Sequence, residues 1–195
     1  MDLSSLLNGP MGQSVISGIA GQLGMDENQA GNAVNAAIPV ILGGLSRNAA
    51  TSDGAESLNN ALNTKHDGSL LDNIAGMFQN NPQELEQDGG GILGHIFGGN
   101  QGAVENAVAQ KTGISMDKIG PLLAMLAPIV MAYLGRQKNQ NNVNSGGLGD
   151  LIGGMLGGGG SKSSGGGIMD MVTGFLDKDK DGSALDDILG MFTKK

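Results

Sequence analysis

Two stretches of the sequence, 89 residues apart, carry the same pattern of helix signals. In the first, a run of apolar residues at helical spacing ends at Gly24, and a longer apolar run follows Asp26 and contains Pro39. Glycine commonly ends a helix and aspartate commonly caps the start of one, so the pattern predicts two helices joined by a tight turn. The residues expected to face the core are Met11, Val15, Ile16, Ile19, Ala20, Leu23, Ala30, Val34, Ala37, Ile38, Ile41, Leu42 and Leu45.

The second stretch repeats the first at the positions that matter for helix geometry. The corresponding pairs are Gly24 with Gly113, Asp26 with Ser115, Gly31 with Gly120, Pro39 with Pro128, Leu45 with Leu134 and Arg47 with Arg136. We therefore expect an all-α fold, a helical bundle built from two pseudo-repeated helical hairpins. Between the hairpins, the sequence predicts short helices near residues 58–62, 67–78 and 91–98, and a polar, glycine-rich loop over residues 80–91.

The composition divides the chain into three parts. Residues 1–139 contain both hairpins and form the expected bundle domain. Residues 140–167 are rich in Gly, Ser and Asn and are predicted to be a flexible linker, because they hold too little apolar surface to offset chain entropy. A short apolar patch at 148–156 interrupts this linker and is expected to dock on the bundle or on another copy. Residues 168–195 are predicted to be a helix-loop-helix tail with an acidic loop.

The acidic loop of the tail belongs to a second internal repeat. Residues 181–192, the tail copy, match residues 67–78, the middle copy, at an offset of 114. Both copies begin Asp-Gly-Ser-x-Leu-Asp and end Gly-Met-Phe. Only the tail copy follows two further aspartates: Asp177 and Asp179 correspond to Asn63 and Lys65. The sequence therefore predicts that both copies start a helix but that only the tail copy holds a metal.

The spacing of the tail aspartates predicts a site for one Ca²⁺. In an EF-hand-type loop, oxygen ligands come from positions 1, 3 and 5, from the backbone carbonyl at 7 and from a later carboxylate, with glycine at 6. The corresponding ligands are Asp177, Asp179, Asp181 and the Ser183 carbonyl. Position 12 is Ile188, which cannot bind a metal, so Asp186 is expected to close the loop, with Asp187 as the alternative. The competing interpretation is a solvated acidic turn with a capping box.

Composition and spacing argue against several classes of function. A formal net charge of -8, without clustered Lys or Arg, argues against a nucleic-acid partner. The absence of cysteine excludes disulfides, thiolate nucleophiles and zinc-thiolate sites. His66 and His95 have no partner residue at a spacing typical of catalysis or zinc binding. We therefore expect no enzymatic activity and no catalytic residues.

The apolar segments do not predict a transmembrane span. The N-terminus has no basic region or long apolar core, so a cytoplasmic location is expected by default, with export by another route as the alternative. The most apolar run, residues 121–135, is shorter than the roughly 17 to 25 residues that cross a bilayer. It also contains Pro128, and we predict that it forms a buried helix.

The repeated hairpin with its internal proline, the Asp-Gly-Ser-x-Leu-Asp-Asp tail and the glycine-rich linker together resemble DUF937, a bacterial domain-of-unknown-function family with YidB-like relatives. The resemblance covers residues 1–139 and, more loosely, the tail. It implies an all-helical fold and brings no established activity or catalytic residues. The tail loop is also similar to the extracellular Excalibur calcium motif, whose last acid is at the tenth position, but the cysteines of that motif are absent here.

Two classes of function remain. The first is a non-catalytic calcium-binding or interaction protein, in which the tail docks on the helical scaffold or on a protein partner when metal is bound. The second is a membrane-surface or self-assembling protein that uses the apolar, glycine-rich segments 91–98 and 147–157.

Overall fold

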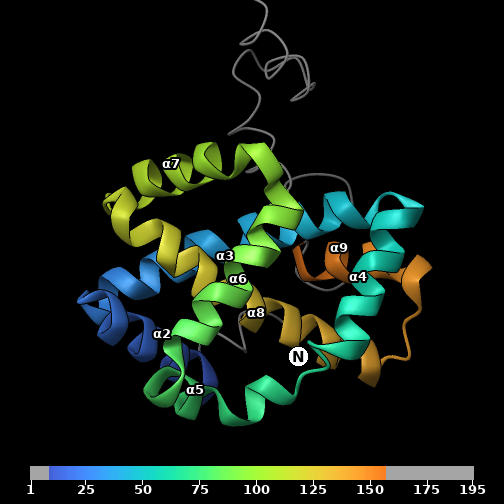
Figure 1. Cartoon of the computed structure of the whole chain (residues 1–195), viewed down its shortest axis with the longest axis horizontal. Coiled ribbons are helices and arrows are strands. Elements are labelled where there is room, and N and C mark those ends of the chain that lie inside the picture. The colour runs from blue at the N-terminus through green and yellow to red at the C-terminus, as the bar shows by residue number, and fades with distance from the viewer. Residues whose placement is uncertain (1–8, 157–195) are drawn as a thin grey trace, which may run out of the picture.

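A computed structural model describes residues 9–156, and every regular element in this part of the chain is helical. The predicted all-α fold is therefore confirmed. In chain order the elements are α2 (Pro10–Leu23), α3 (Glu27–Ala49), α4 (Ser52–Thr64), the 3₁₀ helix η1 (Ser69–Asn73), α5 (Ile74–Asn80), α6 (Pro82–Phe97), η2 (Gly98–Asn100), α7 (Gln101–Thr112), α8 (Met116–Gln140), η3 (Ser145–Gly147) and α9 (Leu148–Leu156). In Figure 1 the shorter helices surround α3 and α8.

The turn between α2 and α3 forms as the sequence predicts. Gly24 follows the last residue of α2 and has φ 56° and ψ 48°, the left-handed conformation that glycine adopts without strain. The Asp26 carboxylate then accepts hydrogen bonds from the Asn28 and Gln29 backbone N–H groups at 2.8 and 3.3 Å. These bonds satisfy two backbone donors that the first turn of α3 leaves open.

The turn between α7 and α8 has the same order of elements but a different cap. Gly113 ends α7 with φ 71°. Ser115 precedes α8 in an extended conformation, and its side chain makes no capping hydrogen bond. The start of α8 therefore depends on packing rather than on a side-chain cap.

This difference predicts unequal effects of substitution at the two caps. Asp26→Ala is expected to lower the free energy of unfolding by about 1 kcal/mol, because it removes both cap bonds. Ser115→Ala serves as the matched control and is expected to have almost no effect, because no cap bond is lost. Urea unfolding followed by circular dichroism measures both values, and equal losses would contradict the assignment of the cap to Asp26.

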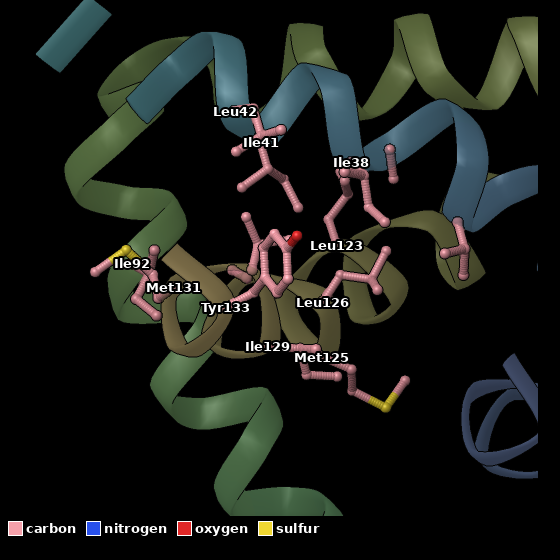
Figure 2. Packing of buried hydrophobic residues seen from close by; sticks show 14 of the residues in the cluster. Ile38, Ile41, Leu42, Ile92, Leu123, Met125, Leu126, Ile129, Met131 and Tyr133 are labelled. Carbon is pink, nitrogen blue, oxygen red and sulfur yellow. The ribbon is translucent and has the colours of Figure 1, made fainter. Parts of the chain in front are cut away.

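The core of the bundle is organised around α8, which is buried along most of its length and packs chiefly against α6 and α3. Its side chains meet those of α3 at the centre of the core in Figure 2, which labels Ile38, Ile41, Leu42, Leu123, Leu126 and Tyr133 among others. Among the described residues, α8 is also the one helix that is long and apolar enough to cross a membrane. In this structure 83% of that apolar window is buried inside the protein, so α8 serves as the core helix.

The predicted loop over residues 80–91 is wrong, because most of it belongs to α6. Pro82 occupies the first turn of this helix, where its missing N–H has no consequence. The glycines that suggested a loop instead permit a close helix crossing. At Gly89 an added Cβ atom would lie 1.6 Å from the backbone oxygen of Ala124 on α8. The polar composition therefore reflects a helix with one face exposed and one face pressed against α8.

The helical bundle continues past residue 139. Residues 148–156 form α9, which packs against α3, and Leu148, Ile152 and Leu156 are buried on its inner face. The apolar patch at 148–156 is therefore docked on the bundle, one of its two expected positions, and this segment is not a flexible linker, because apolar residues four apart share one helical face and bury it. The rest of the predicted linker and the predicted tail, residues 157–195, lie outside the described residues.

Candidate functional site

The predicted calcium ligands Asp177, Asp179, Asp181, Ser183 and Asp186, with the alternative Asp187, all lie outside the described residues. The middle copy of the motif, residues 67–78, lies within them. Its geometry shows how an Asp-Gly-Ser-x-Leu-Asp sequence folds in this protein and which groups its oxygen atoms bind.

The middle copy begins with a turn held by Asp67. The Asp67 carboxylate accepts a hydrogen bond from the Ser69 backbone N–H at 2.9 Å, and Gly68 between them has φ 106°. Ser69 is already the first residue of η1, so Gly68 and not Ser69 occupies the cap position. The hydrogen bonds from Ser69 hold the pKa of Asp67 below its usual value, so this carboxylate stays ionised.

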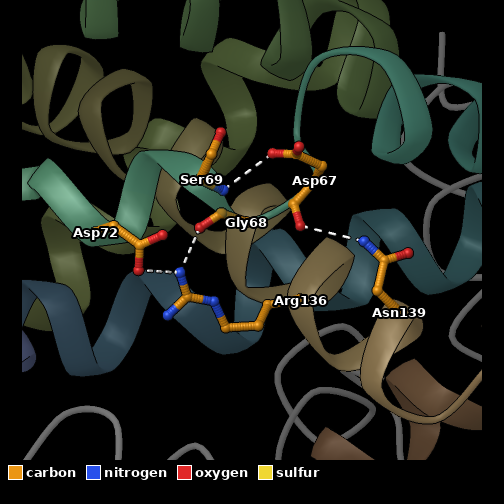
Figure 3. Close-up of polar contacts among 6 residues, drawn as sticks. All are labelled: Asp67, Gly68, Ser69, Asp72, Arg136 and Asn139. Carbon is orange, nitrogen blue, oxygen red and sulfur yellow. Dashed lines mark hydrogen bonds and ion pairs between the residues drawn. The ribbon is translucent and has the colours of Figure 1, made fainter.

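A cation from α8 binds the oxygen atoms of this turn. One nitrogen of the Arg136 guanidinium, Nη2, donates to the Gly68 carbonyl oxygen at 2.6 Å and to the Asp72 carboxylate at 2.5 Å. The Asn139 amide donates to the Asp67 carbonyl oxygen at 3.2 Å from the next turn of α8. Figure 3 shows the three contacts on one side of the turn. The middle copy thus presents a backbone carbonyl and a carboxylate to a positive charge.

Gly135 makes this approach to α8 possible. A Cβ atom at Gly135 would lie 1.9 Å from the backbone oxygen of His66, so any side chain there would push the turn away. Next to it, Lys138 is only 8% exposed, and its ammonium group donates to the Asn63 side-chain oxygen at 2.6 Å. Arg136 and Lys138 therefore bring two positive charges to the segment that precedes and contains the turn.

A second polar cluster joins the end of α4 to α6. Lys65 and Asp88 form an ion pair. The His66 side chain is buried, with its Nε2 atom 3.7 Å from a carboxylate oxygen of Asp88. Burial lowers the pKa of His66, and the charge of Lys65 adds to this effect, while Asp88 and Asp67 oppose it.

This lowered pKa predicts that the protein loses stability in weak acid. The unfolded chain binds a proton on His66 near the ordinary pKa of about 6.5, whereas the folded protein binds it only at lower pH. Protons then favour the unfolded state, so the free energy of unfolding is expected to fall as the pH drops below about 6.5. Urea titrations from about pH 7.5 to about pH 5.5 test this for wild type and His66→Gln.

His66→Gln is expected to flatten this part of the pH profile. His95→Gln, the same substitution at an exposed position, provides the control. A slope that survives in the His66 variant would assign the effect to other groups.

The apolar end of the middle copy rests on α2. Phe78 is buried against Gly18, where an added Cβ atom would lie 2.4 Å from the Phe78 ring. The Gln22 side-chain amide donates to the Phe78 carbonyl oxygen at 3.0 Å. The middle copy is therefore fixed at its start by α8 and at its end by α2.

A further copy of the motif was missed by the sequence reasoning. In α9, Asp150, Ile152, Gly154, Met155 and Leu156 have the same spacing as Asp72, Ile74, Gly76, Met77 and Phe78 in the middle copy. The signal was present as an offset of 78 residues, but it is short and lacks the Asp-Gly-Ser start. In both described copies the isoleucine and the last residue are buried against the bundle.

The described residues do not themselves form a metal site of the expected kind. Within residues 9–156, no group of three or more His, Asp or Glu side chains lies close enough to hold a metal ion. In the middle copy the Asp72 carboxylate binds Arg136, and the Asp67 carboxylate accepts a hydrogen bond from the Ser69 N–H. The oxygen atoms of this turn therefore bind the Arg136 side chain of the same protein.

Comparisons with known proteins bear on the family alone. The search of curated proteins gave no match, and the search of solved structures gave none either. The family model described as "Bacterial protein of unknown function (DUF937)" matches residues 5–137, which is more than half of the chain. The match spans the first hairpin, the whole middle copy and the second hairpin as far as Gln137 of α8. The protein therefore belongs to the bacterial family DUF937, whose function is unknown.

Proposed function

We propose that this protein is a non-catalytic, calcium-binding helical protein that acts through a protein partner or through self-association. One observation supports this proposal more than any other. The middle copy of the repeated motif binds the Arg136 cation with the Gly68 carbonyl and the Asp72 carboxylate. The tail copy keeps the same two groups, at Gly182 and Asp186, and in our proposal it binds Ca²⁺ with its own set of oxygen ligands.

The residues that differ between the two copies favour a metal in the tail. Asp177 and Asp179 stand where the middle copy has Asn63 and Lys65, so the tail gains two carboxylates at alternating positions, with Lys178 and Lys180 between them in place of Thr64 and His66. Carboxylates held close together repel one another unless a cation lies between them. Calcium takes six to eight oxygen ligands, so carboxylates at alternating positions suit it better than they suit one guanidinium.

The scaffold in this proposal consists of the two hairpins, α2–α3 and α7–α8. Their turns have left-handed glycines at Gly24 and Gly113, and their long helices α3 and α8 pack against each other. We propose that they form a pseudo-symmetric unit that carries the tail. Such a unit needs no catalytic residues, and the location expected for it remains cytoplasmic.

Isothermal titration calorimetry of the full chain tests the proposed calcium site. Calcium is expected to bind with an affinity in the micromolar to millimolar range, and Asp177→Asn/Asp181→Asn is expected to abolish the heat. The control is Asp53→Asn/Asp150→Asn, which removes the same charge at two exposed positions on α4 and α9. An absence of heat in the wild-type protein, or equal heats in the wild-type chain and the Asp177/Asp181 variant, would refute the proposal.

The alternative is a membrane-surface or self-assembling protein that uses segments 91–98 and 147–157. It has less support, because Ile92 and Leu93 of the first segment and Leu148 and Ile152 of the second are buried inside the bundle. Flotation with liposomes, with and without calcium, separates the two proposals. We expect the protein to stay with the soluble fraction in both conditions, and flotation would favour the alternative.

A further inference from the structure

The match between the tail and the middle of the chain extends beyond the acidic motif to the whole unit α4–η1–α5, here called the resident unit (residues 52–80). Every buried apolar residue of the resident unit has an apolar counterpart 114 residues later. The buried residues Ala55, Leu58, Leu62, Leu71, Ile74 and Phe78 correspond to Met169, Val172, Leu176, Leu185, Ile188 and Phe192. The tail therefore has the side chains needed to make the same apolar contacts.

The polar side chains of α8 that bind the resident unit would also have hydrogen-bonding or ion-pair partners in the tail. Arg136 binds Asp72, whose counterpart is Asp186. The buried Lys138 binds the amide of Asn63, whose counterpart is Asp177, and a carboxylate forms a stronger hydrogen bond with an ammonium group than an amide does.

Next to these pairs, Asp88 would meet two changed residues. His66 is replaced by Lys180, which brings a positive charge to Asp88, and Lys65 is replaced by Asp179, which brings a negative charge. The two changes oppose each other. The net charge complementarity between the tail and the bundle therefore rests on Arg136 and Lys138.

The surface that receives the resident unit has a specific requirement for glycine. We call it the Arg136 seat, and its residues are Gly18, Gln22, Gly135, Arg136 and Lys138. A side chain at Gly135 would collide with the His66 carbonyl, and one at Gly18 would collide with the Phe78 ring.

The related surface of the other hairpin cannot offer the same seat. The positions that correspond to Gly135 and Gly18 at the hairpin offset of 89 are Ser46 and Ala107, both of which carry a Cβ atom. In addition, α9 already packs on α3. Within residues 9–156, a second copy of the resident unit therefore has to use the Arg136 seat itself.

We propose that, without bound metal, tail residues 169–192 exchange with the resident unit in the Arg136 seat of the same chain, and that calcium prevents this exchange. The 12 residues between Leu156 and Met169 reach about 40 Å when extended. A domain of about 150 residues has a radius of gyration of about 15 Å, so the tail can reach across the bundle. Exchange within one chain is favoured over exchange between chains, because the tether keeps the effective concentration of the tail near the millimolar range.

The effect of calcium rests on the proposed function, because it assumes that the tail loop binds the metal. Asp186 would bind Arg136 in the docked tail but Ca²⁺ in the metal-bound tail. Asp177 would likewise bind either Lys138 or Ca²⁺. Docking with the metal in place would hold a divalent cation beside Arg136 and Lys138, which is strongly repulsive. In this proposal bound calcium opposes docking, which is the reverse of the expectation that bound metal favours docking.

Paramagnetic relaxation enhancement in the full chain tests the exchange directly. The chain has no cysteine, so Lys194→Cys creates a single site for a nitroxide label. Residue 194 corresponds to Asn80, two residues after Phe78, whose carbonyl accepts the Gln22 hydrogen bond. In metal-free protein we expect a selective loss of amide peak intensity over residues 18–23 of α2, and we expect calcium to restore it.

Variants of the tail separate docking from random contact. Ile188→Ala/Phe192→Ala is expected to abolish the intensity loss, because it removes the two side chains that would fill the pockets of Ile74 and Phe78. The control is Met171→Ser, which converts the tail residue to its exposed counterpart Ser57 and should keep the loss in metal-free protein.

Three results would overturn parts of the proposal. No selective loss over residues 18–23 in metal-free protein would refute docking in the seat. A loss seen only when nitroxide-labelled chains are mixed with separate ¹⁵N-labelled chains would place the tail on a second copy and refute exchange within one chain. A loss that persists when calorimetry shows calcium bound would refute mutual exclusion. If the loss occurs but calorimetry shows no calcium binding, docking stands and the proposed function fails.

Discussion

Gly89→Ala is expected to lower the free energy of unfolding by about 3 kcal/mol or more, at the upper end of the range for overpacked cores. The added Cβ atom would lie 1.6 Å from the backbone oxygen of Ala124, and neither group belongs to a flexible side chain. Relief therefore requires α6 to move away from α8 as a whole. That movement would loosen the most extensive helix contact in the described structure.

Gly90→Ala provides the matched control for this prediction. Gly90 is the next residue of α6, is exposed, and has nothing within 4 Å of an added Cβ atom. Because alanine favours a helix over glycine by up to about 1 kcal/mol, this variant is expected to be slightly more stable than wild type. Urea unfolding monitored by circular dichroism measures both variants. Equal stability of the two would contradict the crossing of α6 and α8 at Gly89.

Gly135→Ala is expected to have the second largest effect, a loss of about 2 to 3 kcal/mol. Its Cβ atom would lie 1.9 Å from the His66 carbonyl oxygen, which belongs to the segment leading into the Asp67 turn. The turn would have to leave α8, and Arg136 would lose its contacts with Gly68 and Asp72. The damage is expected to centre on the resident unit, because the rest of α8 packs against α6 and α3.

Hydrogen exchange measured by NMR distinguishes this local effect from general destabilisation. The Ser69 amide, which donates to Asp67, is expected to exchange much faster in Gly135→Ala, while amides in the middle of α3 change less. Gly43→Ala in α3 is the control, since nothing lies within 4 Å of an added Cβ atom there. A uniform change in exchange over all helices would contradict the local role assigned to Gly135.

The long helices were predictable because their signals are local. Gly24, Asp26 and Gly113 fix the ends of helices through backbone geometry and capping, which depend on a few neighbouring residues. The apolar stripe of α3 was also predictable, since its expected core residues are all buried. Both features follow from the period of the helix alone.

The segments that were predicted wrongly depend on tertiary contacts. The glycines of α6 predicted a loop because glycine is a poor helix former. The close approach of α8 at Gly89 explains why a glycine lies inside this helix. The apolar patch at 148–156 predicts docking on the bundle or on another copy, and α9 does pack on the bundle; only its helical form was not predicted, because glycine-rich sequence surrounds it. Sequence period cannot reveal such contacts, because the partner helix is distant in the chain.

The candidate site was predictable as a repeat but not as an arrangement of charges. The sequence shows that residues 67–78 and 181–192 share a motif, and it shows which copy has the additional aspartates. It does not show that Arg136 supplies the cation for the middle copy, because these residues are more than 60 positions apart. The middle copy binds the Arg136 cation, so the two copies are expected to differ in which cation they bind.

The most direct test of this account is a calcium titration of the ¹⁵N-labelled full chain, followed by amide chemical shifts. Calcium is expected to cause saturable shifts of the Gly182 and Ser183 amides in the tail copy. The Gly68 and Ser69 amides should show no shift of comparable size, because Arg136 already binds the oxygen atoms of that turn. If the Gly182 and Ser183 amides do not respond to millimolar calcium, or if Gly68 and Ser69 respond as strongly, the account is contradicted.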